Sequence, residues 1–356
     1  MRRKAIAAAV PADVEVVVTA DPIEGRRCTP FATLAGTAVT DAVDQAARTV
    51  DPDAVAKFLF TSGSTGNPKG VMTTQRMMCS TLQGTIQTMR CLTEAPPVIV
   101  DWLPWNHVFG GNHNFGLAMI TGGSLYIDDG RPVPALFERT LANLREIAPT
   151  AYFNVPRGFE LLALAMQKDD ALRERFFSRV QLLFYAGAGL SQPVWDLFDS
   201  LAVKTIGARV LWVTGLGATE TAPAVTFTAW DGVRSGDIGL PVPGVDVKLV
   251  PVDDKLEIRA RGPTITPGYW REPALTKAAF DEEGYYRLGD GVKFIDADQP
   301  DLGLVFDGRI AEDFKLSSGT WVNVGPLRAK IIAAGAPLVQ DVVLAGLNRD
   351  DLTALI

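Results

Sequence analysis

Residues 60–70 combine side chains and glycines in a way that suits the binding of a phosphate group. The segment reads F-T-S-G-S-T-G-N-P-K-G, with three glycines within eight positions. Glycines let the backbone turn so that successive N–H groups point at one anion. Lys69 adds a positive charge beside the loop. The hydroxyl donors of the segment are Thr61, Ser62, Ser64 and Thr65. The segment is therefore predicted to cradle phosphate.

The flanking sequence predicts ordered elements on both sides of this loop. Residues 58–60 look like the end of a buried strand, and residues 73–90 carry apolar side chains at helical spacing. The expected order is strand, glycine-rich turn and helix, which disfavours the alternative of a mobile Gly/Ser linker. The segment is not a Walker A loop, because that motif has Ser or Thr after its lysine, whereas here Gly70 follows Lys69.

The loop resembles the phosphate-binding motif of the adenylate-forming superfamily, which comprises acyl-CoA synthetases, luciferases and the adenylation domains of peptide synthetases. Three further motifs of that superfamily follow in the same order. They are G-A-T-E-T at 217–221, Y-R-L-G-D at 286–290 and G-R-I-A-E-D-F-K at 308–315. On these four motifs the chain is identified as a member of the superfamily.

The resemblance implies a two-step reaction and a set of nucleotide-binding residues. A carboxylate attacks the α-phosphorus of ATP to give an acyl-adenylate and pyrophosphate, and the thiol of CoA then displaces AMP. Glu220 would bind Mg²⁺, since this cation prefers carboxylate oxygen, and Thr219 would donate to the α-phosphate. Asp290 would accept both ribose hydroxyls, and Arg309 would reach the ribose or a phosphate. The residues that would hold the β- and γ-phosphates are Thr61, Ser62, Gly63, Ser64, Thr65, Gly66 and Lys69.

Glycine-rich backbone is also expected beside the adenine. Gly187 and Ala188 lie in a segment, Y-A-G-A-G, that follows a predicted strand and has little side-chain bulk. Such a segment suits a flat base, and its alternative is a simple strand-to-helix turn. Gly217 precedes the Thr-Glu pair, for which the alternative is a solvated turn. Leu216 departs from the superfamily, which usually has an aromatic residue there, so stacking on the base would come from elsewhere.

A more specific resemblance begins at Asp101. The segment D-W-L-P-W-N-H-V-F-G-G-N-H-N-F-G, followed by residues 125–132, resembles feruloyl-CoA synthases. This implies a planar hydroxycinnamate substrate, stacked among the aromatic side chains of the segment. The alternative for its tryptophans, Trp102 and Trp105, is plain core packing.

The two histidines of the chain lie in the same segment. By resemblance His107 is placed at the acyl pocket beside Phe109, where it would hydrogen-bond the carboxylate or shape the thiol tunnel, with a structural role as the alternative. His113 receives no role. Two histidines without an obvious third ligand do not predict a metal site.

The fold class is α/β. Apolar runs and helical spacing alternate as in a doubly wound sheet, and period-two alternation from about residue 236 predicts a small antiparallel barrel. The expected organisation is a large adenylation domain over 1–308, with the barrel-like part at about 236–308, and the start of an α+β C-terminal lid domain over 309–356. Strands are expected at 14–19, 98–102, 124–127, 180–185 and 210–214, and helices at 135–147, 158–167 and 193–205.

The composition of the chain restricts the classes of binding partner that are expected. The chain has 356 residues, 47% of them hydrophobic, which is enough for a large core. A net charge of −7 disfavours nucleic acid and anionic membranes. The three cysteines are too few and scattered for a disulfide framework, and no apolar run approaches the ~20 residues of a membrane span. A cytoplasmic setting is expected.

Compared with the superfamily, the chain is expected to be the central piece of a larger synthetase, truncated at both ends. Residues 315–319 resemble the loop that lines the CoA channel, but the adenylation lysine of the lid is expected beyond Ile356. Loss of such a cation typically costs on the order of 10³- to 10⁵-fold in rate, so feeble adenylation is expected. The alternatives are a noncatalytic nucleotide-binding remnant, another acyl- or aryl-CoA synthetase, and a peptide-synthetase adenylation domain.

Overall fold

The structure is a computed structural model that describes residues 8, 10–61, 68–335, 338–339 and 341–356. The chain divides into two units, Met1–Asp51 and Pro52–Ile356. In the first unit, Arg26 donates to the backbone carbonyls of Val10, Pro11 and Val14. Its elements are the parallel strands β1 (Val16–Val18) and β2 (Cys28–Pro30) and the helices α2 (Phe31–Ala35) and α3 (Asp41–Arg48).

Parallel strands form the centre of the second unit. β7 (Ala151–Asn154), β8 (Leu182–Tyr185) and β9 (Leu211–Val213) pair in that order. β5 (Val98–Asp101) pairs with β6 (Ser124–Ile127) and also lies beside β7, where the Thr150 N–H donates to the Val98 carbonyl at 2.9 Å. The strands predicted at 98–102, 124–127, 180–185 and 210–214 are therefore confirmed, whereas β7 was not predicted.

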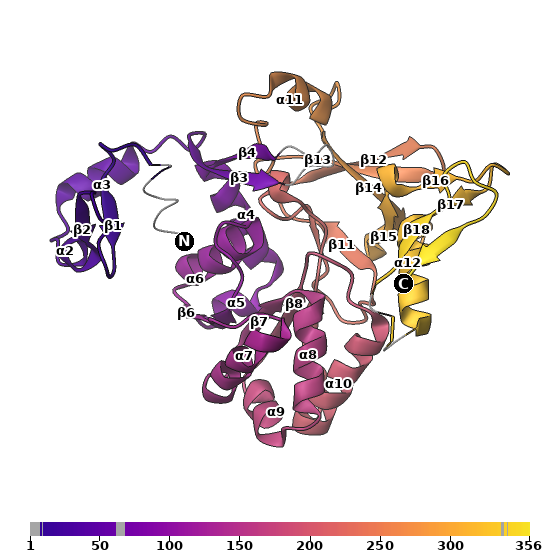
Figure 1. Cartoon of the computed structure of the whole chain (residues 1–356), viewed down its shortest axis with the longest axis horizontal. Coiled ribbons are helices and arrows are strands. Elements are labelled where there is room, and N and C mark those ends of the chain that lie inside the picture. The colour runs from indigo at the N-terminus through magenta and orange to yellow at the C-terminus, as the bar shows by residue number, and fades with distance from the viewer. Residues whose placement is uncertain (1–7, 9, 62–67, 336–337, 340) are drawn as a thin grey trace. The chain divides into compact units, whose positions relative to one another are not determined.

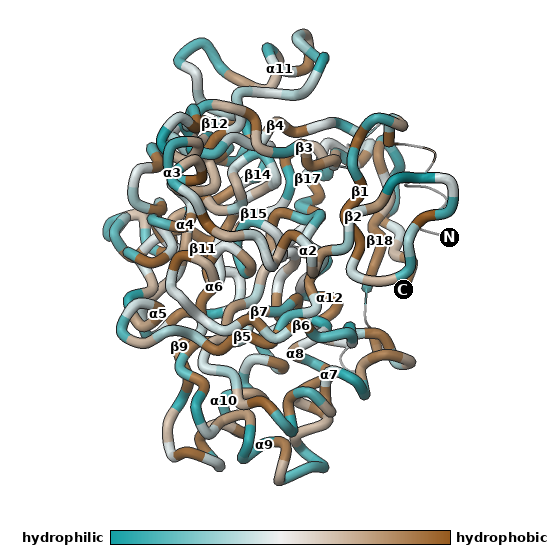
Figure 2. The backbone as a smooth tube through the Cα atoms, turned by 90° about the vertical axis from the view of Figure 1, so that its left-hand side faces the viewer, coloured by the Kyte–Doolittle hydropathy of each residue, from teal (hydrophilic) through white to brown (hydrophobic). Residues whose placement is uncertain are grey.

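Alternate residues of these strands face two different layers. Tyr152, Leu183 and Trp212 pack in one apolar cluster with helices α7 (Pro134–Glu146), α8 (Pro156–Met166), α9 (Asp170–Phe177) and α10 (Gln192–Ile206). Phe153 and Phe184 belong to a second cluster, shared with α5 (Cys91–Glu94), α6 (Phe115–Thr121) and the antiparallel strands. Figure 1 shows the helices on either side of the strands. In Figure 2, hydrophilic and hydrophobic residues alternate along α9 and α10, as in helices with one buried face. The predicted doubly wound α/β fold is confirmed.

The antiparallel part is a six-stranded sheet in the order β10-β11-β15-β14-β13-β12. Register shifts on both sides of β14, between Glu257 and Arg259 and between Asp290 and Val292, mark a bulge. Gly289, with a φ of 72°, provides the left-handed residue that such a bulge needs. The strands are β10 (Thr226–Phe227), β11 (Asp237–Pro241), β12 (Asp246–Val252), β13 (Lys255–Arg261), β14 (Tyr286–Phe294) and β15 (Leu304–Arg309), and α11 (Pro273–Ala279) lies between β13 and β14 in the chain.

The glycine-rich loop connects two antiparallel strands rather than a strand and a helix. β3 (Val55–Thr61) pairs with β4 (Lys69–Thr74), with Thr61 opposite Lys69. Helix α4 (Gln75–Thr88) begins only after β4, where the Thr74 side chain caps it by accepting from the Met77 N–H. The prediction that the loop leads directly into a helix was wrong, because residues 69–74 complete a hairpin first.

The C-terminal residues form small elements after β15. They are β16 (Phe314–Lys315), β17 (Trp321–Val322), α12 (Val324–Gly335), β18 (Val343–Ala345) and β19 (Thr353–Leu355). The division into a large domain and a lid at residue 308 stays a prediction. Among the described residues, no helix is long and apolar enough to cross a membrane.

Candidate functional site

Two of the predicted site segments follow neighbouring parallel strands. The loop containing Gly187 and Ala188 follows β8, and the segment from Gly215 to Glu220 follows β9. Ligands of open α/β sheets bind outside the carboxyl ends of the strands, where these segments lie. Gly187 has a φ of 89°, a conformation that favours glycine, and both Gly187 and Ala188 are exposed. The strand-to-loop transition predicted there is confirmed, and its contact with a base stays a prediction.

The Thr219–Glu220 pair lies in a tightly held turn. Thr219–Thr221 form a short 3₁₀ helix, and the Thr221 hydroxyl donates to the Pro223 carbonyl at 2.7 Å and accepts from the Ala218 N–H at 2.9 Å. A Cβ at Gly217 would lie 1.6 Å from that same Pro223 carbonyl oxygen. Only glycine fits at this position, so Gly217 sets the path that presents Glu220.

Tyr269 joins the phosphate-loop lysine to the proposed magnesium carboxylate. Its hydroxyl donates to Glu220 Oε1 at 2.8 Å, and Lys69 Nζ lies 5.3 Å from the centre of its ring. The backbone agrees, since the Thr266 N–H donates to the Glu220 carbonyl and Val71 forms a bridge with Tyr269. Burial is the main cause that raises the pKa of Tyr269, so this hydroxyl stays protonated and donates.

The ribose-binding candidate lies on the strand that starts beside Tyr269. Tyr286, the first residue of β14, has its hydroxyl 3.4 Å from that of Tyr269. Asp290 follows four residues later on β14 and is buried. Arg309 Nε forms an ion pair with Asp290 Oδ1 at 3.0 Å, with the arginine side chain more than half exposed. Burial raises the pKa of Asp290 to about 6 despite the opposing effect of Arg309, and Glu312 and Glu257 contribute to the rise.

The glycine-rich loop connects the end of β3 at Thr61 to the start of β4 at Lys69. Thr61 and Lys69, which are paired across it, are both partly buried. Five predicted phosphate ligands lie outside the described residues: Ser62, Gly63, Ser64, Thr65 and Gly66. Their roles stay predictions, and the described ends fix only where the loop leaves the sheet.

The aromatic segment after β5 forms a compact unit around a π-helix (Phe109–Asn114). The Trp102 indole N–H donates to Asn154 Oδ1 at 3.0 Å, and the exposed Trp105 ring packs against Phe115 at 4.9 Å between centroids. The Phe109 N–H donates to His107 Nδ1 at 3.2 Å. Although the His107 residue as a whole is exposed, partial burial of its ring lowers its pKa. Its role at the acid stays a prediction.

Two glycines explain the local path of this segment. A Cβ at Gly110 would lie 2.7 Å from the carbonyl oxygens of Leu103 and Pro104, and one at Gly111 would lie 2.1 Å from that of Trp105. The backbone before the π-helix therefore packs directly on its first turn. This close approach orients the whole aromatic segment against the ends of β5 and β7.

Two residues have surroundings in the structure that the sequence did not predict. Tyr269 contacts both Lys69 and Glu220, but it is distant from both in the chain and carries no motif of its own. His113 was given no role, yet it is fully buried among four phenyl rings. In both cases the surroundings of the residue depend on contacts between distant parts of the chain, which a local sequence pattern does not show.

A metal ion at Glu220 would depend on ligands from its substrate. Within the part of the chain that the structure describes, no group of three or more His, Cys, Asp or Glu side chains could hold a metal ion. Glu220 is buried and still presents a carboxylate, which fits one protein ligand of Mg²⁺, with phosphate and water oxygens completing the shell.

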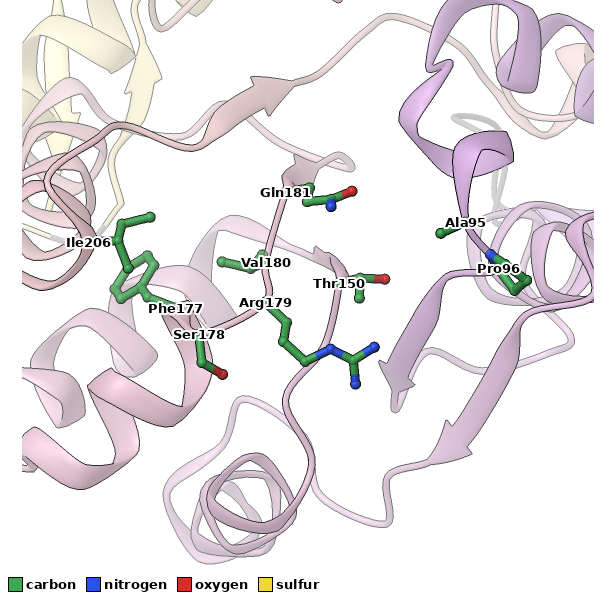
Figure 3. Close-up of a pocket in the computed structure, with 9 residues that line it drawn as sticks. All are labelled: Ala95, Pro96, Thr150, Phe177, Ser178, Arg179, Val180, Gln181 and Ile206. Atoms are coloured by element: carbon green, nitrogen blue, oxygen red, sulfur yellow. The ribbon is translucent and has the colours of Figure 1, made fainter.

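One cavity lies at the opposite, amino-terminal ends of the parallel strands. Its volume is about 550 Å³, and Thr150 and Gln181, which precede β7 and β8, line it together with Arg179 (Figure 3). It contains none of the predicted site residues. The position of this cavity does not favour it as the main site, because ligands of such sheets bind at the carboxyl ends.

Comparison with known proteins agrees with this geometry. A family model described as AMP-binding enzyme matches residues 3–270. A long-chain-fatty-acid–CoA ligase of Escherichia coli O157:H7 is 30% identical over 318 residues, which cover 83% of this chain and 50% of that ligase. The mitochondrial malonate–CoA ligase of Homo sapiens is 24% identical over 376 residues, covering 95% of this chain and 63% of that protein.

A solved structure gives the same picture. A malonyl-CoA ligase in a ternary product complex with methylmalonyl-CoA and AMP is 26% identical and superimposes with a TM-score of 0.68, covering 99% of this chain and 73% of that one. This chain spans about half the length of the fatty-acid ligases that it matches.

Proposed function

We propose that this chain, which belongs to the AMP-binding enzyme family, is the nucleotide- and acyl-binding part of an AMP-forming carboxylate–CoA ligase whose acid is a hydroxycinnamate such as ferulate. The observation that carries the proposal is the meeting of two elements at Tyr269. Its hydroxyl donates to Glu220, and its ring lies beside the Lys69 ammonium. The phosphate-loop lysine and the magnesium carboxylate thereby share one contact.

Each of these residues would bind a different part of the nucleotide, according to the charge of that part. Lys69 at the end of the glycine-rich loop would neutralise the β- and γ-phosphates, and Thr219 would donate to the α-phosphate. Asp290, which lies at the bulge in β14, would accept hydrogen bonds from the ribose hydroxyls. Adenylyl transfer asks a protein chiefly to position the reactants and to neutralise charge, which these groups can do. Magnesium bound at Glu220 would supply further neutralisation of the phosphates.

The aromatic segment supports an aromatic acid. Related ligases act on long-chain fatty acids and on malonate, according to their names. In this chain, Trp102, Trp105, Phe109 and Phe115 gather after β5, beside the ends of the parallel strands. Planar rings offer large contact areas to another planar ring, whereas malonate is too small to use them. The sequence resemblance to feruloyl-CoA synthases points to the same class.

Binding of intermediate analogues tests the proposal without requiring turnover. The chain is titrated calorimetrically with feruloyl, palmitoyl and malonyl sulfamoyladenosines, which replace the acyl phosphate with a stable sulfamate. We expect the feruloyl compound to bind most tightly. Replacement of the ribose acceptor by Asp290→Asn is expected to weaken all three compounds by about 10-fold or more, because it removes a charged hydrogen-bond acceptor.

The outcomes separate the two parts of the proposal. Tighter binding of the palmitoyl or malonyl compound would refute the hydroxycinnamate and leave the ligase. If none of the three compounds binds, the nucleotide site itself is wrong.

A further inference from the structure

His113 lies at the centre of an aromatic cage. The residue has no exposed surface. Its ring centre lies 5.8 Å from that of Phe109, 5.4 Å from Phe153, 5.0 Å from Phe184 and 6.4 Å from Phe227. Phe153 and Phe184 are the last residues but one of β7 and β8, so the cage lies beneath the carboxyl ends of these strands.

The protonation state of the imidazole follows from its hydrogen bond with Asn114. Nδ1 lies 2.9 Å from Asn114 Oδ1, an amide oxygen that can only accept, so Nδ1 carries the proton and donates. Burial lowers the pKa of His113 to about 4, and the ring is therefore neutral at pH 7. Nε2 is then left with a lone pair and acts as an acceptor.

That acceptor belongs to a group of buried polar atoms after β5 that have no partner among the described residues; the others are Asp101 Oδ2, both polar atoms of the Asn112 amide and Asn114 Nδ2. Within the described residues, Nε2 of His113 has no hydrogen-bond partner. The buried carboxylate of Asp128, by contrast, accepts from the Gly130 N–H, the Thr140 hydroxyl and the Asn143 amide. Buried polar atoms without a partner are uncommon and costly, so a missing donor is the natural explanation.

We propose that His113 Nε2 accepts a hydrogen bond from a hydroxyl group on the aromatic ring of the acid, and that His113 is thereby a specificity-determining residue. The inference rests on the proposed function, because it requires the acid to reach this side of the sheet. Insertion of the acid requires the phenyl side chains of the cage to change rotamer. The planar ring then replaces contacts of the same kind.

The chemistry of the acceptor distinguishes the acid classes. A phenolic hydroxyl supplies the donor that Nε2 lacks. An alkyl chain end has no polar hydrogen, and a second carboxylate has no proton at neutral pH and would be repelled by the lone pair. A methoxy group in place of the hydroxyl also only accepts. The structure thus favours a hydroxylated aromatic acid over a fatty acid, over malonate and over an O-methylated analogue.

The first test uses the unmodified chain and three matched ligands. These are the sulfamoyladenosines of 4-hydroxycinnamate, 4-methoxycinnamate and cinnamate, titrated calorimetrically. We expect the hydroxy compound to bind about 10- to 100-fold more tightly than both others, as for a buried acceptor that regains its partner. Equal binding of the three, or preference for the methoxy compound, would overturn the inference.

Variants then assign the preference to His113. His113→Phe removes the acceptor in surroundings that already hold phenyl rings, and it should reduce the preference to about 2-fold or less. His113→Gln places an amide near the position of Nε2 and should retain part of it. Thr140→Val, a buried polar substitution at Asp128, serves as the control and should leave the preference unchanged. A merely structural histidine would weaken all three ligands together, with the ratio preserved.

The two proposals fail in different ways. If none of the three ligands binds to the unmodified chain, the proposed function is wrong. If all bind with no preference for the hydroxyl, the nucleotide site stands and the role of His113 is refuted. Because this comparison needs no variant, a variant that does not fold leaves it intact.

Discussion

Asp290 is subject to two opposing influences at one carboxylate. Burial favours its protonated form, while the Arg309 guanidinium, 3.0 Å away, favours the ionised form. Burial dominates, and the pKa is raised to about 6. In its proposed role Asp290 accepts hydrogen bonds from two ribose hydroxyls and has to be ionised, so we expect it to bind the ribose only above about pH 6.

Nucleotide affinity should therefore depend on pH through Asp290. Below pH 6 the carboxyl group gains a proton, and AMP affinity should fall towards 10-fold per pH unit, since only the ionised form accepts both hydroxyls. Calorimetric titration with AMP between pH 5 and 8 measures this. Asp290→Asn should weaken binding and remove the inflection, while Asp298→Asn, at an exposed aspartate, should keep it. An unchanged inflection in Asp290→Asn would show that another group titrates.

The same shift predicts the sign of a stability change. The folded pKa lies above the unfolded value, so the stabilising contribution is complete below about pH 4 and is lost as the pH rises through about 6. At pH 7 the ionised group costs stability, and Asp290→Asn should raise the free energy of unfolding by about 1–3 kcal/mol. Urea denaturation at pH 7 and pH 4 measures the difference, which should vanish at the lower pH. A destabilised variant at pH 7 would contradict the assignment.

At the scale of elements, a buried ion pair joins the antiparallel sheet to the C-terminal residues. Lys255 at the start of β13 pairs with Asp313, and both side chains are almost completely buried. Asp313 also accepts from the Val324 N–H at the start of α12, at 2.9 Å, and Lys255 donates to the Asp307 carbonyl of β15. One carboxylate thus ties β13 and α12 to the segment between them.

Removing one partner of this pair should be costly. Lys255→Met leaves a buried carboxylate without its cation and should lower the free energy of unfolding by about 3–5 kcal/mol. The double variant Lys255→Met with Asp313→Leu should lose less than Lys255→Met alone. Lys293→Met, which breaks the exposed pair with Asp307 on the same sheet, is the matched control and should cost less than about 1 kcal/mol. Similar losses for both lysines in denaturant unfolding would contradict the role of burial.

Helices and strands whose apolar residues recur at a regular spacing were predictable from the sequence. Elements that depend on contacts between residues distant in the sequence were not. β6, α8 and α10 lie within two residues of their predicted bounds, because apolar spacing defines them. The hairpin at Lys69 was missed, since a glycine-rich phosphate loop occurs before helices as well as between strands. The π-helix depends on Gly110 and Gly111, whose lack of a Cβ lets the backbone of Leu103–Trp105 pack against them. No local sequence pattern shows this contact. Tyr269 meets Glu220 across 49 positions of the chain.

At the scale of the molecule, an apolar edge borders the parallel strands. Among the described strands, β6 pairs only with β5, and it carries exposed Tyr126 and Ile127. Met119 and Ile120 of the adjoining helix α6 are also exposed. A strand with free backbone groups and apolar side chains is a template for association.

We expect the chain to self-associate through this edge. Ile127→Lys, which places a charge at a residue that is 70% exposed, should shift sedimentation velocity profiles towards the monomer over the same concentration range. Val203→Lys, at an exposed apolar residue of α10 that is outside β6, should leave the profiles unchanged. If both variants behave like the unmodified chain, association does not occur through β6.

We propose that the glycine-rich hairpin, the Thr219–Glu220 turn and β14 form one nucleotide site. A crystal structure of the chain grown with ATP and magnesium tests it most directly. We expect the triphosphate beside Lys69, the metal ion at Glu220 and the ribose hydroxyls within hydrogen-bond distance of Asp290. Density for ATP at another place, such as the cavity lined by Arg179, with these three residues free of the nucleotide, would contradict it.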